Sequence, residues 1–600
     1  MEGRRMGGAR GIIPVEKPKN FWQTSKRLLG YFKNEKSLIS FVVLLIIVDG
    51  AIVLAIPYII GRAVDIISLN TIDSNLLKIT VAALAAGYAA DSLCTFIQGW
   101  IMAGVSQRII KGFRSGLFGK LQKLSTAFFD LHTHGDIMSR LSNDIENVST
   151  TISQSTVQLL SGFFAVLGTL VMMIILSPLL TLAAVVTVPL ALILTKTIAG
   201  KTAVLFKKQQ QDLGKLNGHI EEAISGISVI KAFNYEDKII DQFDKLNNSL
   251  RDVGLKAQIW TGYLMPLMNV INNIGFALIA FTGGILAIKG LISIGVIASF
   301  ISYSRQFSRP FSDFANIFNT LQSAAAGAER VFEILDELEE EKDVQGAREL
   351  KDVKGDVVFE NVSFGYRPDI PIIKNISFSV KSGDSIALVG ATGAGKTTLV
   401  NLVSRFYDVT SGRILIDGTD IKEYTRDSLR KCFGIVLQDT YLFSGTIKEN
   451  IKYGNLEASD EEVMKAADMA GAHTFITRMP SGYDTELSES GSNLSQGQRQ
   501  LLAIARAILS NPSILILDEA TSSVDTRTEL RIQQSMLKIM AGRTSFIIAH
   551  RLSTIIDADT ILVIDNGQIV EKGNHESLIN QNGVYHNLYY NQLQKLDISL

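Results

Sequence analysis

Residues 388–398 read LVGATGAGKTT, which fits the phosphate-binding pattern G-x-x-x-x-G-K-[ST]. The glycines permit a sharp turn that points backbone N–H groups at phosphate oxygens, while Lys396 supplies a positive charge and Thr397 a hydroxyl for Mg²⁺. An apolar, strand-like run at 385–389 precedes the loop, and a helix-compatible run at 397–406 follows it. The unpaired N–H groups at the start of that helix favour anion binding. We therefore predict a nucleotide-binding α/β domain around this loop.

The composition of the chain argues against several classes of protein. At 600 residues it is too long for one domain, and its hydrophobic content of 47% is high for a soluble protein of this size. The net charge of −1 gives no general attraction to nucleic acid, so we predict no nucleic-acid partner. The two cysteines, Cys94 and Cys432, lie in regions that we predict to be membrane and soluble respectively, which argues against a disulfide framework. The first 20 residues lack the apolar core of a signal peptide, and we predict a disordered tail there.

Six long apolar stretches occur in the first half of the chain. They lie near 38–60, 77–105, 156–176, 180–199, 259–288 and 292–307. Several approach or exceed the roughly 20 residues that a helix needs to cross a bilayer. A buried soluble core is the alternative, but six such stretches favour a membrane domain of six transmembrane helices. Ahead of them, the aromatic and basic residues of 21–31 predict either a helix along the membrane interface or a plain solvated helix.

The loops between these stretches alternate in length and in charge. The connections after the first, third and fifth stretches are short, whereas those after the second and fourth are long. Lys and Arg gather in the segment before the first stretch and in the two long loops. By the positive-inside rule, we expect these parts, and the phosphate loop with them, to face the cytoplasm.

The two long loops show helical periodicity, and each contains a local break, around 128–135 and around 212–218. The first break carries Phe128 and Phe129. A short exposed segment with paired aromatic residues at the tip of a helical hairpin suits docking onto another domain. A simple helical turn is the alternative.

Polar residues lie within or beside the apolar stretches, where an unpaired charge is costly. They are Asp49, Asp91, Asn269, Asn272, Asn273, Arg305 and Arg309. Each one either faces a substrate path or forms hydrogen bonds between helices, and together they favour a water-filled cavity.

The second half alternates strand-like and helical runs from residue 357 onward, as an α/β domain does. The acidic run at 336–343 before it is interpreted as a solvated linker. A buried-strand run ends in Asp518 and Glu519, placing Asp518 to hold Mg²⁺ and Glu519 to polarise an attacking water. Another apolar run ends at His550, which either contacts the γ-phosphate from the same sheet edge or has a structural role.

Residues 493–498, NLSQGQ, form a polar, glycine-containing start for a strong helix over 499–509. This is a second anion-binding helix start within one domain. A single ATP needs only one such cradle, so we expect the second to close on a nucleotide held by another subunit.

With these motifs, the chain resembles the ABC exporter half-transporters from about residue 21 to its C-terminus. The resemblance implies an all-α membrane domain of the type I ABC exporter fold, with six transmembrane helices, plus an α/β P-loop ABC ATPase domain. It implies ATP contacts from Tyr366, Gly390, Ala391, Thr392, Gly393, Ala394, Gly395, Lys396, Thr397, Thr398, Ser495, Gly497, Gln498 and Asp525. It implies catalytic roles for Glu519, His550, Lys396 and Gln438, and Mg²⁺ binding by Thr397, Gln438 and Asp518. The breaks at 128–135 and 212–218 resemble the coupling helices of the family, and Glu486 and Glu489 resemble its X-loop.

The chain departs from the family pattern at two points. Its signature motif reads LSQGQ, with Gln496 in place of a glycine, a variant that occurs in working exporters. Its X-loop ends in Ser490-Gly491, where an arginine often precedes the glycine. The intact Glu519 implies a half-site competent for hydrolysis. The LSQGQ motif and the pattern at 14–19 resemble the catalytically intact subunit of bacterial heterodimeric multidrug exporters, so we expect a heterodimer, with a homodimer as the alternative.

We predict four segments along the chain. They are a cytosolic tail with an interfacial helix (1–36), a membrane domain (37–330), a linker (331–353) and a nucleotide-binding domain (354–600). The resemblance implies an ATP- and Mg²⁺-dependent exporter of hydrophobic or amphipathic drugs or lipids, in the bacterial cell membrane with both termini in the cytoplasm. A lipid flippase or peptide exporter is the alternative within transport. An ATP-gated channel or a regulatory membrane ATPase is the alternative outside it.

Overall fold

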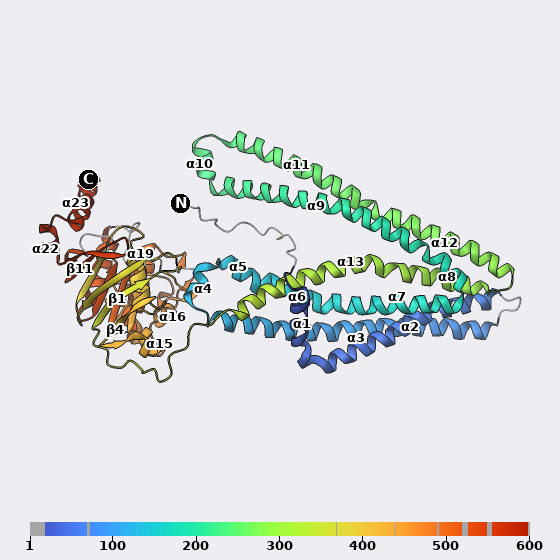
Figure 1. The fold of residues 1–600 in the computed structure, drawn as a ribbon, viewed down its shortest axis with the longest axis horizontal. Helices are drawn as coiled ribbons and strands as arrows, with labels where there is room; N and C mark the ends of the chain where they lie inside the picture. The colour runs from blue at the N-terminus through green and yellow to red at the C-terminus, as the bar shows by residue number, and fades with distance from the viewer. Residues whose placement is uncertain are drawn as a thin grey trace. The chain divides into compact units, whose positions relative to one another are not determined.

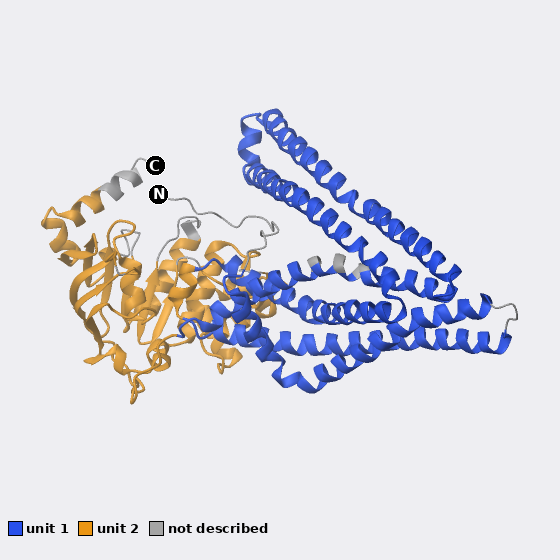
Figure 2. Cartoon of the chain, turned by 45° about the vertical axis from the view of Figure 1, so that its right-hand side comes forward, with its two compact units in different colours: residues 1–124, 132–339 blue, residues 125–131, 340–600 orange. Residues whose placement is uncertain are grey.

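The computed structural model describes residues 18–68, 73–367, 369–437, 440–488, 491–518, 526–548 and 555–597. The chain divides into two compact units (Figure 2). Unit 1 comprises residues 1–124 and 132–339, and unit 2 comprises residues 125–131 and 340–600. The first long loop of the membrane half therefore contributes a short segment to unit 2.

Unit 1 is built from helices, several of them long (Figure 1). In chain order its elements are α1 (Phe21–Tyr31), η1 (Phe32–Glu35), α2 (Lys36–Ser68), α3 (Ser74–Leu121), α5 (His134–Ser139), η2 (Arg140–Asp144), α6 (Ile145–Thr150), η3 (Thr151–Ser155), α7 (Thr156–Leu176), α8 (Pro178–Val185), α9 (Thr187–Ser225), α10 (Ile227–Ala232), α11 (Glu236–Gly262), α12 (Leu264–Ile288) and α13 (Ile294–Asp336).

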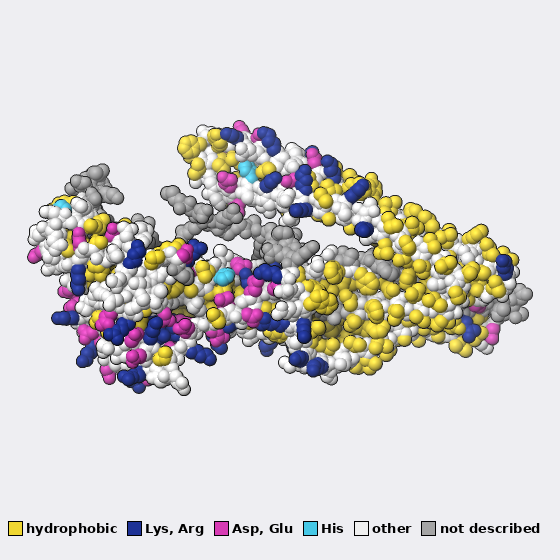
Figure 3. Space-filling model, in the orientation of Figure 1, with side chains coloured by type: hydrophobic (Ala, Val, Ile, Leu, Met, Phe, Trp, Pro, Cys, Tyr) yellow, Lys and Arg dark blue, Asp and Glu magenta, His cyan; other side chains and the backbone are white. Residues whose placement is uncertain are grey.

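Five helical segments among the described residues are long and apolar enough to cross a membrane. They are Phe21–Ser68, Ser74–Leu121, His134–Leu176, Pro178–Ser225 and Glu236–Ile288, and they contain the first five predicted stretches. Hydrophobic side chains gather over the end of unit 1 where α7, α8 and α12 lie (Figure 3). The sixth predicted stretch begins α13, which is not among the five, because Ser304, Arg305 and Gln306 interrupt its apolar run.

The ends of α2 and α13 are joined by direct contacts. The Asp65 carboxylate of α2 accepts hydrogen bonds from Ser293 Oγ and from the Gly295 N–H, both at 2.7 Å. A Cβ atom on Gly295 would lie 2.0 Å from the backbone oxygen of Gly61, so the two helices meet backbone to backbone and only glycine fits there.

The first helix, α1, forms where the sequence predicts it and is tied to α13. Arg27 donates two hydrogen bonds to the Asp336 carboxylate, at 2.5 and 2.7 Å, and its guanidinium lies 4.1 Å from the centre of the Phe332 ring. Trp22 on the same helix is 84% exposed, as suits an aromatic residue that enters a membrane interface. The interfacial placement itself stays a prediction.

The second long loop differs from the prediction. α9 continues unbroken through 212–218, so the predicted break there is wrong, and α10 forms the tip instead. The buried Asp212 carboxylate of α9 accepts a hydrogen bond from Ser249 Oγ of α11 at 3.1 Å. Packing of α9 against α11 outweighs the cost of about 1 kcal/mol for each glycine inside a helix.

Unit 2 combines sheets with covering helices (Figure 1). Its strands are β1 (Val357–Phe364), β2 (Ile373–Val380), β3 (Ser385–Val389), β4 (Ser411–Ile416), β5 (Thr419–Asp420), β6 (Phe433–Val436), β7 (Gly445–Thr446), β8 (Glu486–Leu487), β9 (Ile514–Asp518), β10 (Thr544–Ile548), β11 (Thr560–Asp565) and β12 (Gln568–Gly573). Its helices are α4 (Thr126–Leu131), α14 (Lys396–Val403), η4 (Ile421–Glu423), α15 (Arg426–Lys431), α16 (Ile447–Lys452), α17 (Asp460–Met469), α18 (His473–Ile476), η5 (Gly482–Asp484), α19 (Gln496–Leu509), α20 (Thr526–Met540), α22 (His575–Asn580) and α23 (Val584–Asp597).

The six-stranded sheet of unit 2 brings three strand ends together. Its order is β12-β11-β3-β10-β9-β6, and β11, β3, β10, β9 and β6 run parallel. Leu388 of β3 pairs with Ile548 of β10, which pairs in turn with Asp518 of β9. Because parallel strands end at the same edge, the last residues of β3, β9 and β10, which are Val389, Asp518 and Ile548, lie at one rim of the sheet.

The predicted solvated linker also differs from the structure. Within 336–343, Glu340 and Asp343 form ion pairs with Arg430 and Arg426 of α15 instead of facing water alone. An acidic run has the same sequence pattern whether its charges face water or form ion pairs with distant arginines. The pattern therefore does not distinguish the two cases.

Candidate nucleotide-binding site

The predicted phosphate loop joins β3 to α14, as the motif requires. Gly390, Gly393 and Gly395 have φ angles of 155°, 84° and 110°, which side chains rarely adopt. A Cβ atom on Gly390 would lie 2.1 Å from the backbone oxygen of Ile564, and one on Gly395 would lie 2.7 Å from Ile373 Cδ1. The loop therefore keeps its course only with glycine at these positions.

Lys396 is held within this loop. Its Nζ donates hydrogen bonds to the backbone oxygens of Gly390 at 2.7 Å and Ala391 at 3.0 Å, and the residue is buried. Burial lowers the pKa of its ammonium group, and the nearby Asp518 carboxylate opposes that shift. The structure thus brings Lys396 and Asp518 into the same electrostatic environment.

The residues present fit an ATP·Mg²⁺ substrate. Ala391, Thr392, Gly393 and Thr397 are exposed at the loop, and the loop precedes the N-terminus of α14. Among the described residues, no group of three His, Cys, Asp or Glu side chains is placed to hold a metal. One hydroxyl from Thr397 and one carboxylate from Asp518 suit Mg²⁺, which takes few protein ligands when phosphate oxygens supply others.

Tyr366, the predicted adenine-stacking residue, is anchored beside the loop. Its hydroxyl lies 3.3 Å from Thr398 Oγ1 and accepts from Asn401 Nδ2 at 3.4 Å. Its ring meets the Tyr407 ring edge-on, with 5.0 Å between centroids, and the residue is 46% exposed. A ring fixed at its hydroxyl and open to solvent is suited to stacking on a base.

The signature motif opens α19 with a capping box. Ser495 Oγ accepts from the Gln498 N–H at 3.3 Å, and Gln498 Oε1 accepts from the Ser495 N–H at 2.9 Å. Ser495 is exposed and Gly497 is buried. The motif thus presents a polar helix start at the surface of unit 2.

Other predicted site residues lie outside the described residues. They are Gln438, Glu489, Glu519, Asp525 and His550. Their roles stay predictions.

The tip of the first long loop docks within unit 2. Thr126 Oγ1 of α4 donates to the Phe406 oxygen at 3.4 Å, and the Tyr407 hydroxyl donates to the Asp130 carboxylate. Burial, followed by that hydrogen bond, raises the pKa of the Tyr407 hydroxyl, which keeps it protonated and able to donate. Tyr407, which holds both α4 and Tyr366, was not found by sequence reasoning, because no motif marks it.

Unit 1 contains a cavity of about 810 Å³ between α7 and α13. Its lining combines polar and apolar side chains, among them Gln158, Ala165, Arg305, Asp313, Phe314 and Ile317. Of the polar residues predicted within or beside the apolar stretches, Arg305 lines this cavity, whereas Asp49 and Asp91 are not part of its lining.

Comparison with known proteins adds independent evidence. Residues 39–311 match the family model of the ABC transporter transmembrane region, and residues 373–522 match that of the ABC transporter. The "Uncharacterized ABC transporter ATP-binding protein YfiC" of Bacillus subtilis is 48% identical over 96% of both chains. A fatty acid ABC transporter ATP-binding/permease protein of Mycobacterium bovis is 39% identical, over 96% of this chain and 97% of its own. A solved bacterial Atm1-family ABC exporter with ATP bound matches with a TM-score of 0.73 and 31% identity, over 93% of this chain and 98% of its own.

Proposed function

The chain belongs to the ABC transporters that fuse a membrane domain to one ATPase domain, and we propose that its cargo is an amphipathic lipid or drug. It is an ATP-hydrolysing exporter and a multi-pass membrane protein. The observation that carries the cargo class is the cavity of unit 1, where Arg305 and Asp313 stand beside Phe314 and Ile317. A volume of about 810 Å³ lies within the range of sites for drug-sized ligands.

A lipid is the cargo that we favour within this class. The Mycobacterium bovis relative is named a fatty acid transporter, and a lipid tail suits the apolar part of the lining while a polar head suits Gln158 and Arg305. A peptide cargo is the alternative within this function. We propose that the protein lies in a bacterial cell membrane with both termini in the cytoplasm, as the distribution of Lys and Arg predicts.

In the proposed dimer, residues of both subunits contact each bound ATP. We propose that Lys396 and the N–H groups of its loop hold the phosphates, while Ser495 of a second subunit closes on them from the other side. Glu519 removes a proton from the attacking water, and Asp518 and Thr397 would hold a Mg²⁺ ion, which would neutralise charge on the phosphates. Closing and opening of the paired units alternates the access of the cavity to the two sides of the membrane.

Transport by the reconstituted protein tests this function. Purified chain, alone and with a candidate partner half-transporter, is placed in lipid vesicles with ATP and Mg²⁺, and ATP hydrolysis is measured with added fatty acids, phospholipids and hydrophobic drugs. We expect lipids to stimulate hydrolysis and to be moved across the bilayer. ATP-dependent ion currents would indicate a channel, and hydrolysis that no cargo changes would indicate a regulatory ATPase.

The second loop tip supports a dimer. α10 lies in unit 1, whereas α4 lies in unit 2. The tip exposes Ile227, Val229 and Phe233, the last by 75%. Unit 2 carries a groove of about 440 Å³ whose lining includes Phe443, Tyr453 and Leu456. We propose that α10 of one subunit docks in this groove of a second subunit, in a heterodimer such as the LSQGQ signature predicts.

Phe233→Asp is expected to lower cargo-stimulated ATP hydrolysis by about tenfold, because a charge in an apolar contact loses burial and adds desolvation. Hydrolysis without cargo should change much less. Leu255→Asp, which changes an exposed leucine on α11, serves as the matched control. If both variants keep normal stimulation, α10 is not a docking element.

A further inference from the structure

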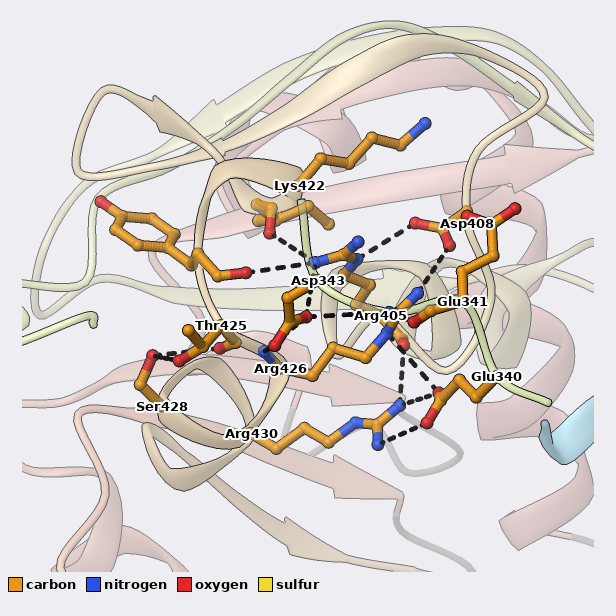
Figure 4. Close-up of polar contacts among 12 residues, drawn as sticks. Glu340, Glu341, Asp343, Arg405, Asp408, Lys422, Thr425, Arg426, Ser428 and Arg430 are labelled. Carbon is orange, nitrogen blue, oxygen red and sulfur yellow. Dashed lines mark hydrogen bonds and ion pairs between the residues drawn. The ribbon is translucent and has the colours of Figure 1, made fainter. Parts of the chain in front are cut away.

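An acidic segment of unit 2, residues 340–343, lies against three arginines that follow α14 or belong to α15 (Figure 4). We call Arg405, Arg426 and Arg430 the arginine cluster. Glu340, Asp343 and Asp408 supply three carboxylates for its three guanidinium groups. The charges balance, and Arg405 and Arg426 are almost fully buried.

Arg430 joins the acidic segment to the backbone after α14. Its Nη2 donates to Glu340 Oε1 at 2.5 Å and its Nη1 to Glu340 Oε2 at 3.4 Å, a two-pronged pair. The same Nη2 donates to the backbone oxygen of Arg405 at 3.1 Å, and the guanidinium lies 5.4 Å from the Phe406 ring centre.

Arg426 makes the second link. Its backbone N–H donates to the Asp343 carboxylate at 3.2 and 3.3 Å, and its Nη1 donates to the backbone oxygen of Glu341. Its Nη2 donates to Asp408 Oδ2 at 3.0 Å. One arginine therefore holds the acidic segment on one side and Asp408 on the other.

Arg405 closes the network around a strained backbone. Its Nε donates to Asp408 Oδ1 at 3.1 Å, and its Nη1 donates to the backbone oxygens of Ile421 and Tyr424 at 3.2 and 3.3 Å. Its φ of 53° is uncommon for a residue with a side chain. Such a conformation persists when surrounding contacts hold it.

The segment held in this way, residues 405–408, is also the segment that receives α4. Phe406 offers its backbone oxygen to Thr126, and Tyr407 donates to Asp130. Tyr407 also touches Tyr366, the predicted adenine-stacking residue. Residues 405–408 thus contact the acidic segment, α4 and the nucleotide site.

We propose that Glu340 and Asp343 are positioning residues for the coupling of ATP hydrolysis to transport. Through Arg426 and Arg430 they keep residues 405–408 in the conformation that receives α4, so that movements of the ATPase unit reach the membrane helices through a firm contact. In the part of the chain that the structure describes, the hydrogen bonds and ion pairs of the acidic segment go to Arg405, Arg426 and Arg430, not to the phosphate loop or the signature motif. Its loss uncouples the two processes without stopping ATP hydrolysis. The inference rests on the proposed export function.

A charge-reversal series tests the proposal in the reconstituted transporter. Glu340→Arg, Arg430→Glu and the double reversal are compared by the amount of lipid moved per ATP hydrolysed. Each single reversal is expected to lower this ratio by ~3-fold or more, as for residues of a coupling network, with cargo-free hydrolysis within ~2-fold of the unmodified protein. The double reversal should recover part of the loss. Glu340→Gln, the mildest change, should show a smaller loss of the same kind.

Arg413→Glu is the matched control, because Arg413 pairs with Glu360 at 2.6 Å on the exposed surface of β4 and β1 in the same unit. The amount of lipid moved per ATP hydrolysed should not change in this variant. An unchanged ratio in both Glu340 variants would overturn the inference.

Hydrogen exchange separates this inference from the proposed function. The amides of residues 405–408 should exchange ~5-fold faster in Glu340→Arg and measurably faster in Glu340→Gln, and Arg413→Glu should match the unmodified protein. This readout needs no cargo. If the unmodified protein hydrolyses ATP and moves nothing, the proposed function fails. Hydrogen exchange then tests separately whether the acidic segment holds residues 405–408. If these amides exchange at the normal rate in both Glu340 variants, the inference about the acidic segment is overturned.

Discussion

Glu519→Gln is expected to slow ATP hydrolysis by at least ~100-fold while ATP binding persists, since general-base catalysis contributes ~10²–10⁴-fold. Glu519 follows Asp518 directly in the sequence, and Asp518 ends β9 beside Ile548 of β10 at the rim of the sheet. Glutamine keeps the size of the side chain and cannot accept the proton of the attacking water. Phosphate release measures the rate, and a fluorescent ATP analogue measures binding.

The matched control for this change is Glu461→Gln. Glu461 is an exposed glutamate in the first turn of α17, and its replacement should leave both measurements unchanged. Hydrolysis at the normal rate in Glu519→Gln would remove the general base from the proposed mechanism.

Gly390→Ala is expected to weaken ATP binding by ~100-fold, or ~2.7 kcal/mol. The added Cβ atom would lie 2.1 Å from the backbone oxygen of Ile564 in β11, the strand beside β3, and 3.4 Å from Ala394 Cβ. A backbone oxygen within a sheet cannot move away without breaking strand pairing, so the loop must move instead. That shift takes the Gly390 oxygen away from Lys396 Nζ, and so displaces the charge that meets the phosphates.

Substitutions of two other glycines show how much of the effect comes from the steric collision and how much from the strained backbone conformation. Gly393 lies in the loop with a φ of 84°, and Gly418 lies in the turn between β4 and β5 with a φ of 81°; neither has an atom within 4 Å of an added Cβ. Gly418→Ala should lower the unfolding temperature with normal ATP affinity, and Gly393→Ala should fall between the other two in affinity. Equal losses of affinity in Gly390→Ala and Gly418→Ala would show that the collision is irrelevant.

The phosphate loop was predictable because its chemistry is local. The turn, the lysine and the helix start are consecutive residues, and the structure places them as the motif requires. Tyr407 was not predictable, since its partner Asp130 lies 277 residues away and enters unit 2 on a different element. No pattern within one segment contains such a pairing.

At the tip of the second long loop, a local sequence signal led to a wrong prediction because long-range packing overrides it. Gly214 and Gly218 made a break in α9 a reasonable prediction, because glycine lowers helix stability. The contact between Asp212 and Ser249, which lie 37 residues apart on neighbouring helices, belongs to packing that periodicity does not report. The true tip at α10 follows Gly226, the C-cap of α9.

The length of the α9–α11 hairpin determines how far the hairpin tilts when its tip moves. α9 has 39 residues and is therefore ~58 Å long, with α10 at its far end. If α10 follows the ATPase unit of a second subunit through ~10 Å, the hairpin turns by only ~10° about its membrane end. A large movement of the tip would thus produce only a small tilt at the membrane end of the hairpin. Helices packed side by side can accommodate such a small tilt while remaining in contact.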